Sequence, residues 1–168
     1  MNIVLIGFRG AGKTALAKIL AEKLDMQLYS IDKIVEEKEG KRIRDIVAEK
    51  GWQYFRELES QIIEQLSDVD NAINDTGGGA VENPSNIDNL KKNGYIVYVQ
   101  SSLKDIKQRI LNDPDRPKLN PTLDVEDDLT VTYNRRLPLY EECSDFRVNT
   151  SIKSLEQCAD EIVKFVSG

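Results

Sequence analysis

The sequence predicts a three-layer α/β/α fold, in which a parallel sheet of five strands lies between helices. Five short apolar runs alternate along the chain with segments of helical pattern, as in successive strand–helix–strand units. The first apolar run, residues 3–6, leads through a glycine-rich loop into a run of good helix formers, residues 15–24. A length of 168 residues is typical of one domain, so we expect residues 1–168 to form a single domain.

Composition restricts the classes of function. The net charge of −6 disfavours a nucleic-acid surface, which needs a basic face. The chain has no histidine, which excludes Ser–His, Cys–His and histidine–metal chemistry. Its two cysteines, Cys143 and Cys158, lack metal-site spacing and favour a reducing compartment. The N-terminus enters the first strand at once and no apolar run is long enough to span a membrane, so we expect a cytoplasmic protein without a signal peptide. We also expect a monomer, which the net charge would keep in solution.

The loop of residues 7–14 matches the phosphate-binding pattern G-x-x-x-x-G-K-[ST] at every fixed position. Its glycines let the backbone turn so that N–H groups point inward at an anion, and the following helix adds a partial positive charge. Lys13 would reach the β- and γ-phosphates of a nucleotide, and the Thr14 hydroxyl would bind Mg²⁺. The alternative is an ordinary glycine-rich turn beside a surface lysine, which the flanking strand and helix disfavour.

Acidic residues follow the next two expected strands, at the sheet edge where parallel α/β proteins bind ligands. Asp32 comes after residues 26–30 and is either a first-turn helix acid or a carboxylate that faces the phosphate acceptor. Asp75 ends residues 71–75 and is either a turn former or, as we prefer, the acid that holds Mg²⁺. The three glycines at 77–79 then indicate a close approach of the backbone to a ligand.

Residues 33–66 are helical in pattern, with breaks expected at Gly40 and Gly51. Arg56, which lies in this segment, has two interpretations. It is either a solvated arginine or a partner of Glu59, or it is a clamp for an anion, since a guanidinium grips a carboxylate through two hydrogen bonds.

The loop of about residues 112–128 is long and polar and contains three prolines. Long loops inside compact domains are usually functional or mobile. We therefore expect a lid over the nucleotide, with Arg116 reaching the phosphates. The alternative is a disordered surface loop.

The remaining elements are predicted from caps and periodicity. Gly94 should close one helix, Ser101 and Ser102 should cap another, and Pro138 should kink or restart a third. Ser154 should cap a terminal helix that has one apolar face. The expected helices are 84–93, 103–111, 129–142 and from 155 onward, and the expected strands are 95–99 and 145–149.

Taken together, these stretches resemble the shikimate kinase family, in the same order and over nearly the whole chain. The loop at 7–14 is shared with many nucleotide-binding proteins, whereas the other pieces are far more specific. They are Asp32 after the second strand, Phe55-Arg56-Glu57-Leu58-Glu59, Gly77-Gly78-Gly79-Ala80-Val81, Asp115-Arg116-Pro117 and Arg136-Leu137-Pro138-Leu139-Tyr140.

The resemblance implies a P-loop kinase fold like that of nucleoside monophosphate kinases, and transfer of the γ-phosphate of ATP to the 3-hydroxyl of shikimate with Mg²⁺. It implies that Lys13, Asp32 and Arg116 act in catalysis. It also implies that a segment of about 32–62 binds the acceptor, with shikimate held by Asp32, Arg56, Gly77, Gly78, Gly79 and Arg136. ATP would be bound by Gly10, Ala11, Gly12, Lys13, Thr14, Ala15, Arg109, Arg116 and Lys153.

The chain departs from the family at the metal. The family usually has Asp-x-Asp at the end of the second strand, with the first acid linked to Mg²⁺, and here that position is Ser30, a weaker partner for the ion. Asp75 is an acid where the family more often has a small residue, so we expect Thr14 and Asp75 to hold the metal.

Two other functions stay open: a related kinase for gluconate, a nucleoside or a nucleotide, and a nucleotide-binding module without turnover. Arg56 and Arg136 favour an acceptor that carries a carboxylate. The N-K-x-D signature of GTPases is not found in the sequence, which disfavours a guanine-nucleotide switch.

Overall fold

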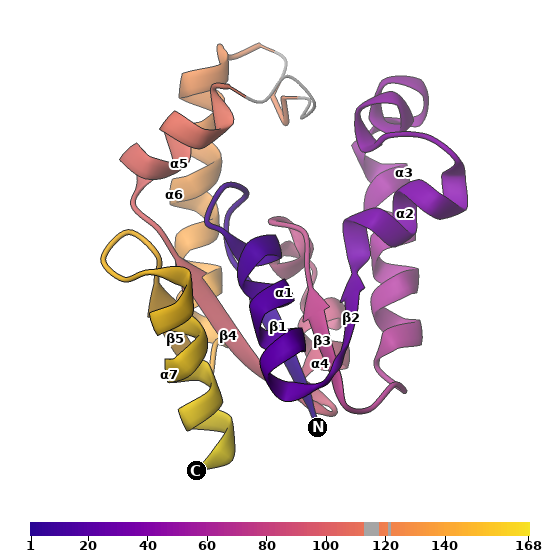
Figure 1. The fold of residues 1–168 in the computed structure, drawn as a ribbon. Coiled ribbons are helices and arrows are strands. Elements are labelled where there is room, and N and C mark those ends of the chain that lie inside the picture. Colours follow the sequence, from indigo (N-terminus) through magenta and orange to yellow (C-terminus); the bar gives the residue numbers. More distant parts are fainter. Residues whose placement is uncertain (113–117, 121) are drawn as a thin grey trace.

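The first strand of the chain lies at the centre of the sheet. In the computed structural model, which describes residues 1–112, 118–120 and 122–168, the strand order is β2-β3-β1-β4-β5 and each pair of neighbours is parallel (Figure 1). Val4 of β1 is in register with Asn74 of β3 on one side and with Ile96 of β4 on the other. The expected five-stranded parallel sheet is confirmed. Its strands are β1 (Asn2–Ile6), β2 (Gln27–Ser30), β3 (Ala72–Asp75), β4 (Gly94–Gln100) and β5 (Phe146–Asn149).

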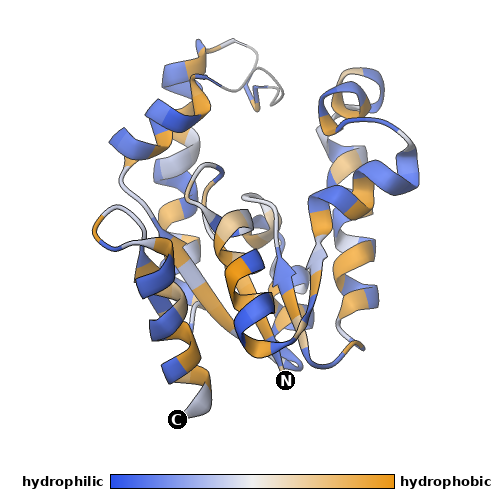
Figure 2. Ribbon diagram, viewed as in Figure 1, coloured by the Kyte–Doolittle hydropathy of each residue, from blue (hydrophilic) through white to orange (hydrophobic). Residues whose placement is uncertain are grey.

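Helices cover both faces of the sheet because its strands are apolar on both sides. Ile3 and Leu5 of β1 pack with α1 and α7 on one face, while Val4 and Ile6 face the remaining helices on the other. Figure 2 shows apolar residues on the strands and on helix sides that face them. The helices are α1 (Lys13–Leu24), α2 (Ile31–Glu39), α3 (Ile43–Leu66), the 3₁₀ helix η1 (Ala80–Glu82), α4 (Pro84–Lys91), α5 (Leu103–Ile110), α6 (Val125–Cys143) and α7 (Leu155–Ser167).

Glycines and caps set most helix ends as the sequence predicts. Gly40 ends α2 with a φ of 67°, and Gly51 has φ 84° and ψ 168°, so it kinks α3 just before the residues that line the site. Ser102 caps α5, and Ser154 caps α7 in a reciprocal arrangement with Gln157. In the described part of the chain, no helix is long and apolar enough to span a bilayer.

Two expectations about element ends need correction. Gly94 begins β4 instead of closing α4, because its backbone pairs with Asn2 of β1. Helix α6 starts at Val125, inside the loop expected at 112–128, because Asp124 caps it by accepting the Asp127 N–H. The same helix continues through Pro138 without a restart. Ser30 occupies the N-cap position of α2 but makes no side-chain capping bond.

Candidate active site

Lys13 is the first residue of α1, and its side chain folds back over the loop that precedes it. The ammonium Nζ donates hydrogen bonds to the carbonyl oxygens of Gly7, at 2.6 Å, and Phe8, at 3.0 Å. The loop can curl around this position because Gly10 and Gly12 have φ values of 80° and 96°, in the region that glycine favours. The positive charge therefore lies within the loop at the N-terminus of α1, where an anion would bind.

A cavity of about 310 Å³ lies beside this loop. Arg109 of α5 also lines it and donates from Nη1 to the Gly10 carbonyl at 2.6 Å, which holds its side chain against the glycine loop. Among the described residues, Ala11 and Lys153 do not line the cavity: Ala11 is buried, and Lys153 forms an ion pair with Glu161 of α7. The expected nucleotide-binding residues that line it are Gly10, Gly12, Lys13, Thr14, Ala15 and Arg109.

The Thr14 hydroxyl and the Asp75 carboxylate meet on the floor of this cavity. Thr14 Oγ1 donates to Asp75 Oδ2 at 2.8 Å, and Ser30 is the register partner of Asp75 across β2 and β3. All three residues line the cavity, together with Asp32. This set offers hard oxygen ligands, which suit Mg²⁺. Within the described residues, no three His, Cys, Asp or Glu side chains gather as a metal-ligand group, so an ion here would also need water or phosphate oxygens.

A second, narrower pocket of about 20 Å³ adjoins the first and shares Arg9, Asp32, Gly77 and Gly78 with it. The shared residues mean that a group in one pocket borders a group in the other. The second pocket also has Trp52, Phe55, Arg56 and Glu59 of α3, Gly79, Leu119 and Arg136 of α6 on its walls.

The glycines after β3 are required by the side chains that pack against them. A Cβ on Gly79 would lie 2.3 Å from Arg56 Nη2, and a Cβ on Gly77 would lie 2.8 Å from Glu59 Oε2. On Gly78 a Cβ would lie 3.2 Å from Arg136 Nη1. Bare backbone is therefore what lets both guanidiniums and the Glu59 carboxylate come close to this turn.

Arg56 is both an ion-pair partner and a wall of the narrow pocket. Its Nη1 donates to Glu59 Oε1 at 2.9 Å, and its guanidinium also stacks near the rings of Trp52 and Phe55. Burial raises the pKa of Glu59, and the nearby Asp32 carboxylate raises it further, while the Arg56 guanidinium opposes both effects. The two alternatives for Arg56, pairing and anion binding, are thus compatible in one geometry.

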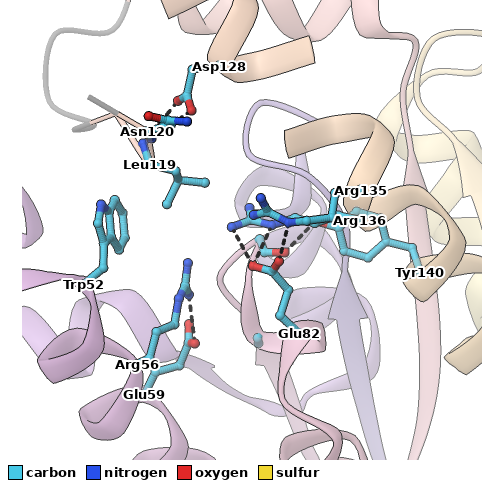
Figure 3. A network of polar contacts seen from close by, with 12 residues as sticks. Trp52, Arg56, Glu59, Glu82, Leu119, Asn120, Asp128, Arg135, Arg136 and Tyr140 are labelled. Atoms are coloured by element: carbon cyan, nitrogen blue, oxygen red, sulfur yellow. Dashed lines mark hydrogen bonds and ion pairs between the residues drawn. The ribbon is translucent and has the colours of Figure 1, made fainter. Parts of the chain in front are cut away.

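Arg136 extends from α6 and is bound by the carboxylate of Glu82 in η1, a residue that the sequence analysis did not identify. Glu82 Oε2 accepts from Arg136 Nε at 3.2 Å, and Glu82 Oε1 accepts from Arg135 Nε at 2.7 Å (Figure 3). Burial raises the pKa of Glu82, but the two guanidiniums outweigh that effect and hold it below its usual range. Tyr140, one turn further along α6, donates to the Gly78 carbonyl at 2.5 Å. Helix α6 therefore supplies both the pocket arginine and the hydroxyl that binds the turn at 77–79, and Glu82 of η1 holds the arginine in place.

The chain matches the family described as shikimate kinase over residues 9–167. The chain belongs to the shikimate kinase family. A shikimate kinase of Sulfurihydrogenibium sp. (strain YO3AOP1) is 41% identical over 162 residues, which is 96% of this chain and 95% of that one. A shikimate kinase of Dehalococcoides mccartyi (strain BAV1) is 39% identical over 96% of this chain and 90% of that one.

Solved shikimate kinases have the same fold. The enzyme of Acinetobacter baumannii, in complex with shikimate, superposes with a TM-score of 0.91 at 31% identity and covers 98% of this chain and 92% of that one. The enzyme of Aquifex aeolicus superposes with a TM-score of 0.86 at 30% identity, covering 100% and 97%. The expected P-loop kinase fold and the resemblance are confirmed. The chain is therefore a kinase, with ATP as its co-substrate.

The structure brings most of the expected site of this chain together. Lys13, Thr14, Asp32 and Asp75 line the larger cavity, and the expected acceptor residues Asp32, Arg56, Gly77, Gly78, Gly79 and Arg136 line the narrow pocket. Arg116 lies outside the described residues. The sequence pattern did not indicate Glu82, Leu119 or Trp52 as part of the site, because none of them belongs to a recognisable motif.

Proposed function

We propose that the chain transfers the γ-phosphoryl group of ATP to the 3-hydroxyl of shikimate, giving shikimate 3-phosphate and ADP. One observation carries the proposal: Arg56 and Arg136 come from two different helices to the glycine turn at 77–79, in a pocket that shares four residues with the nucleotide cavity. Two guanidiniums suit one carboxylate, and the shared walls bring a hydroxyl on the same ring next to the phosphate donor.

The roles of the residues follow from charge. The transferred group spreads negative charge over its oxygens, so catalysis depends on cations and positioning. We propose that Lys13 supplies a cation at the β- and γ-phosphates and that Arg116 supplies another. Asp32, on the wall shared by both pockets, would accept the hydrogen bond of the acceptor hydroxyl and take its proton. Backbone N–H groups of the loop would hold the phosphates, and Arg109 would contact the nucleotide base.

The metal proposal concerns Thr14 and Asp75. Their hydrogen-bonded oxygens at the cavity floor fit an ion that takes one or two protein ligands plus phosphate oxygens and water. Mg²⁺, when bound, would neutralise charge on the β- and γ-phosphates. Ser30 would complete the set through a weaker contact, in the register position next to Asp75.

The proposed segments also have structural support. Helices α2 and α3 supply five of the residues that line the narrow pocket, which supports an acceptor-binding segment of about 32–62. The lid proposed at about 112–128 includes the first turn of α6, and its finger Arg116 lies outside the described residues. The two cysteines are buried thiols, which supports our expectation of a cytoplasmic protein, and we propose that it acts as a monomer.

A coupled ADP-release assay with a panel of acceptors tests the function. Shikimate should give turnover, whereas quinate, gluconate and AMP should give little. Turnover with another acceptor but not with shikimate would overturn the assignment. ATP consumption without any acceptor would indicate a nucleotide switch, and tight binding of both ligands without turnover would indicate a binding module.

A further inference from the structure

Residues 118–120, called here the strap, lie outside any helix or strand at the edge of the narrow pocket, where Figure 3 shows Leu119 and Asn120. The Leu119 side chain forms a wall of the pocket, facing Trp52 and Arg56. A volume of about 20 Å³ leaves space for roughly one water molecule, so an acceptor ring must displace a wall when it enters. Irregular backbone opens more readily than packed helices, and the irregular turn at 77–79 is buried whereas residues 118 and 120 are exposed, so we expect the strap to be the wall that moves.

The strap is tethered at two points of unequal strength. Asp128 Oδ2 accepts the Leu119 N–H at 3.1 Å and Asp128 Oδ1 accepts the Asn120 N–H at 3.0 Å, and the Asp128 residue is 2% exposed. On the other side, the Trp52 indole Nε1 donates to the Lys118 carbonyl at 3.1 Å in an exposed position. Hydrogen bonds to an ionised carboxylate are roughly twice as strong as neutral ones. Asp128 is therefore the fixed tether, and Trp52 is the releasable one.

Asp128 also links the position of the strap to the position of α6. Asp128, Thr132, Arg136 and Tyr140 follow one another at intervals of four residues, and all are buried. Residues four apart lie on the same side of a helix. A single stripe of α6 thus carries the tether of the strap, the arginine of the pocket and the hydroxyl that binds the Gly78 carbonyl.

We propose that Asp128 is a positioning residue for the acceptor. Asp128 keeps the strap attached to α6 when the hydrogen bond between Trp52 and Lys118 breaks and the strap opens. When the strap closes again, Leu119 returns to the same position over the acceptor, which Arg56 and Arg136 bind. Asp128 has this effect through Leu119 and contacts no reacting atom. The inference rests on the proposed function, since it presupposes an acceptor in the narrow pocket.

The test compares Asp128→Asn with Asp127→Asn. An asparagine keeps the shape of the side chain but can accept only one of the two N–H bonds. Asp127 is exposed, so Asp127→Asn is a control that removes the same charge at the neighbouring position. We expect Asp128→Asn to raise the KM for shikimate by about tenfold, with the KM for ATP within twofold of wild type, since one charge-assisted bond is lost. Trp52 is the only tryptophan, so its emission should shift to the red and be quenched more by acrylamide.

A double-mutant cycle then separates positioning from general loosening. Leu119→Ala should raise the KM for shikimate by a similar factor, and the double variant should be no worse than Asp128→Asn alone, because both changes remove the same contact. Additive effects, equal losses for ATP and shikimate, or a KM for shikimate unchanged from that of Asp127→Asn would each refute the proposal. Absence of shikimate turnover in the wild type would instead refute the proposed function.

Discussion

Thr14 and Asp75 are joined by a hydrogen bond of 2.8 Å that links the first turn of α1 to the end of β3. Asp75→Asn should keep this bond but remove the charge. We expect about a tenfold loss of affinity for ADP in the presence of Mg²⁺, with metal-free ADP binding unchanged, because the ion prefers carboxylate oxygens. Calorimetry with and without Mg²⁺ measures both, and Asp68→Asn, an exposed change of equal charge, is the control.

The register of β2 and β3 suggests a second substitution that should restore Mg²⁺-dependent binding to the Asp75→Asn variant. Ser30 and Asp75 are directly paired, so Ser30→Asp would put a carboxylate beside the position that Asp75→Asn vacates. The double variant should recover most of the Mg²⁺-dependent affinity. No recovery would mean that the carboxylate of Asp75 has a role that position 30 cannot supply.

Arg136→Lys keeps the positive charge but removes the planar guanidinium group. The residue is buried and bonded to Glu82, and lysine cannot bind a carboxylate with two parallel bonds. We expect kcat/KM for shikimate to fall about 100-fold, roughly 3 kcal/mol, with ATP affinity retained. Arg135→Lys, at the exposed neighbour that shares Glu82, should change kcat/KM by less than about threefold. Equal losses for the two variants would contradict the assigned role of Arg136.

Gly79→Ala tests the close contact between the turn and α3. The backbone of Gly79 has φ −97°, which any residue adopts, so the added methyl acts only through its clash with Arg56 at 2.3 Å. Displacement of that guanidinium should raise the KM for shikimate by at least about tenfold. Nucleotide affinity, measured by titration with ADP, serves as the internal control, and its loss would point to a wider distortion.

The raised pKa of Glu59 predicts how stability depends on pH. Burial disfavours the ionised form in the folded state, so the contribution of Glu59 is complete below its unfolded pKa of about 4.3 and is lost as the pH rises through the folded pKa. Glu59→Gln removes this loss, so its free energy of unfolding relative to wild type should increase with pH above about 4. Urea unfolding from pH 4 to pH 8 gives the slope.

For Glu82, the free energy of unfolding should depend on pH in the opposite direction in the same experiment. Because its pKa is lowered in the folded protein, its contribution is present above the unfolded pKa and is lost as the pH falls through the folded value. Glu82→Gln should therefore be less stable than wild type by roughly 1 kcal/mol at pH 7, a small value because the side chain is 30% exposed, and nearly equal to it in acid. Slopes of the same sign for the two variants would contradict one of the two assignments.

The fold was predictable because its signals are local. Alternating apolar strands, the loop at 7–14 and breaks at Gly40 and Gly51 each depend on a few neighbouring residues. Element ends were less predictable where a distant partner decides them. Gly94 looks like a helix stop, but its pairing with Asn2 of β1 makes it the first residue of a strand.

The site was predictable where residue type and motif coincide, and not where the fold joins separate segments. Arg56, Arg136 and the glycines at 77–79 lie far apart in sequence, and family resemblance indicated that they act together. Nothing in the sequence pairs Glu82 with Arg136, 54 residues away, or Trp52 with the carbonyl of Lys118, 66 residues away. Such pairs depend on how α3, η1 and α6 pack, which periodicity alone does not specify.

The four-residue spacing along α6 limits how the length of this chain can vary. Loss or gain of one residue between Asp128 and Arg136 would rotate the two ends of the stripe by about 100° relative to each other, so the tether and the arginine could not both face the pocket. A single-residue insertion or deletion between Asp128 and Arg136 should therefore be more damaging than one after Tyr140, near the end of the helix. A library of single-residue deletions along α6, scored for growth that requires the enzyme, should show this difference.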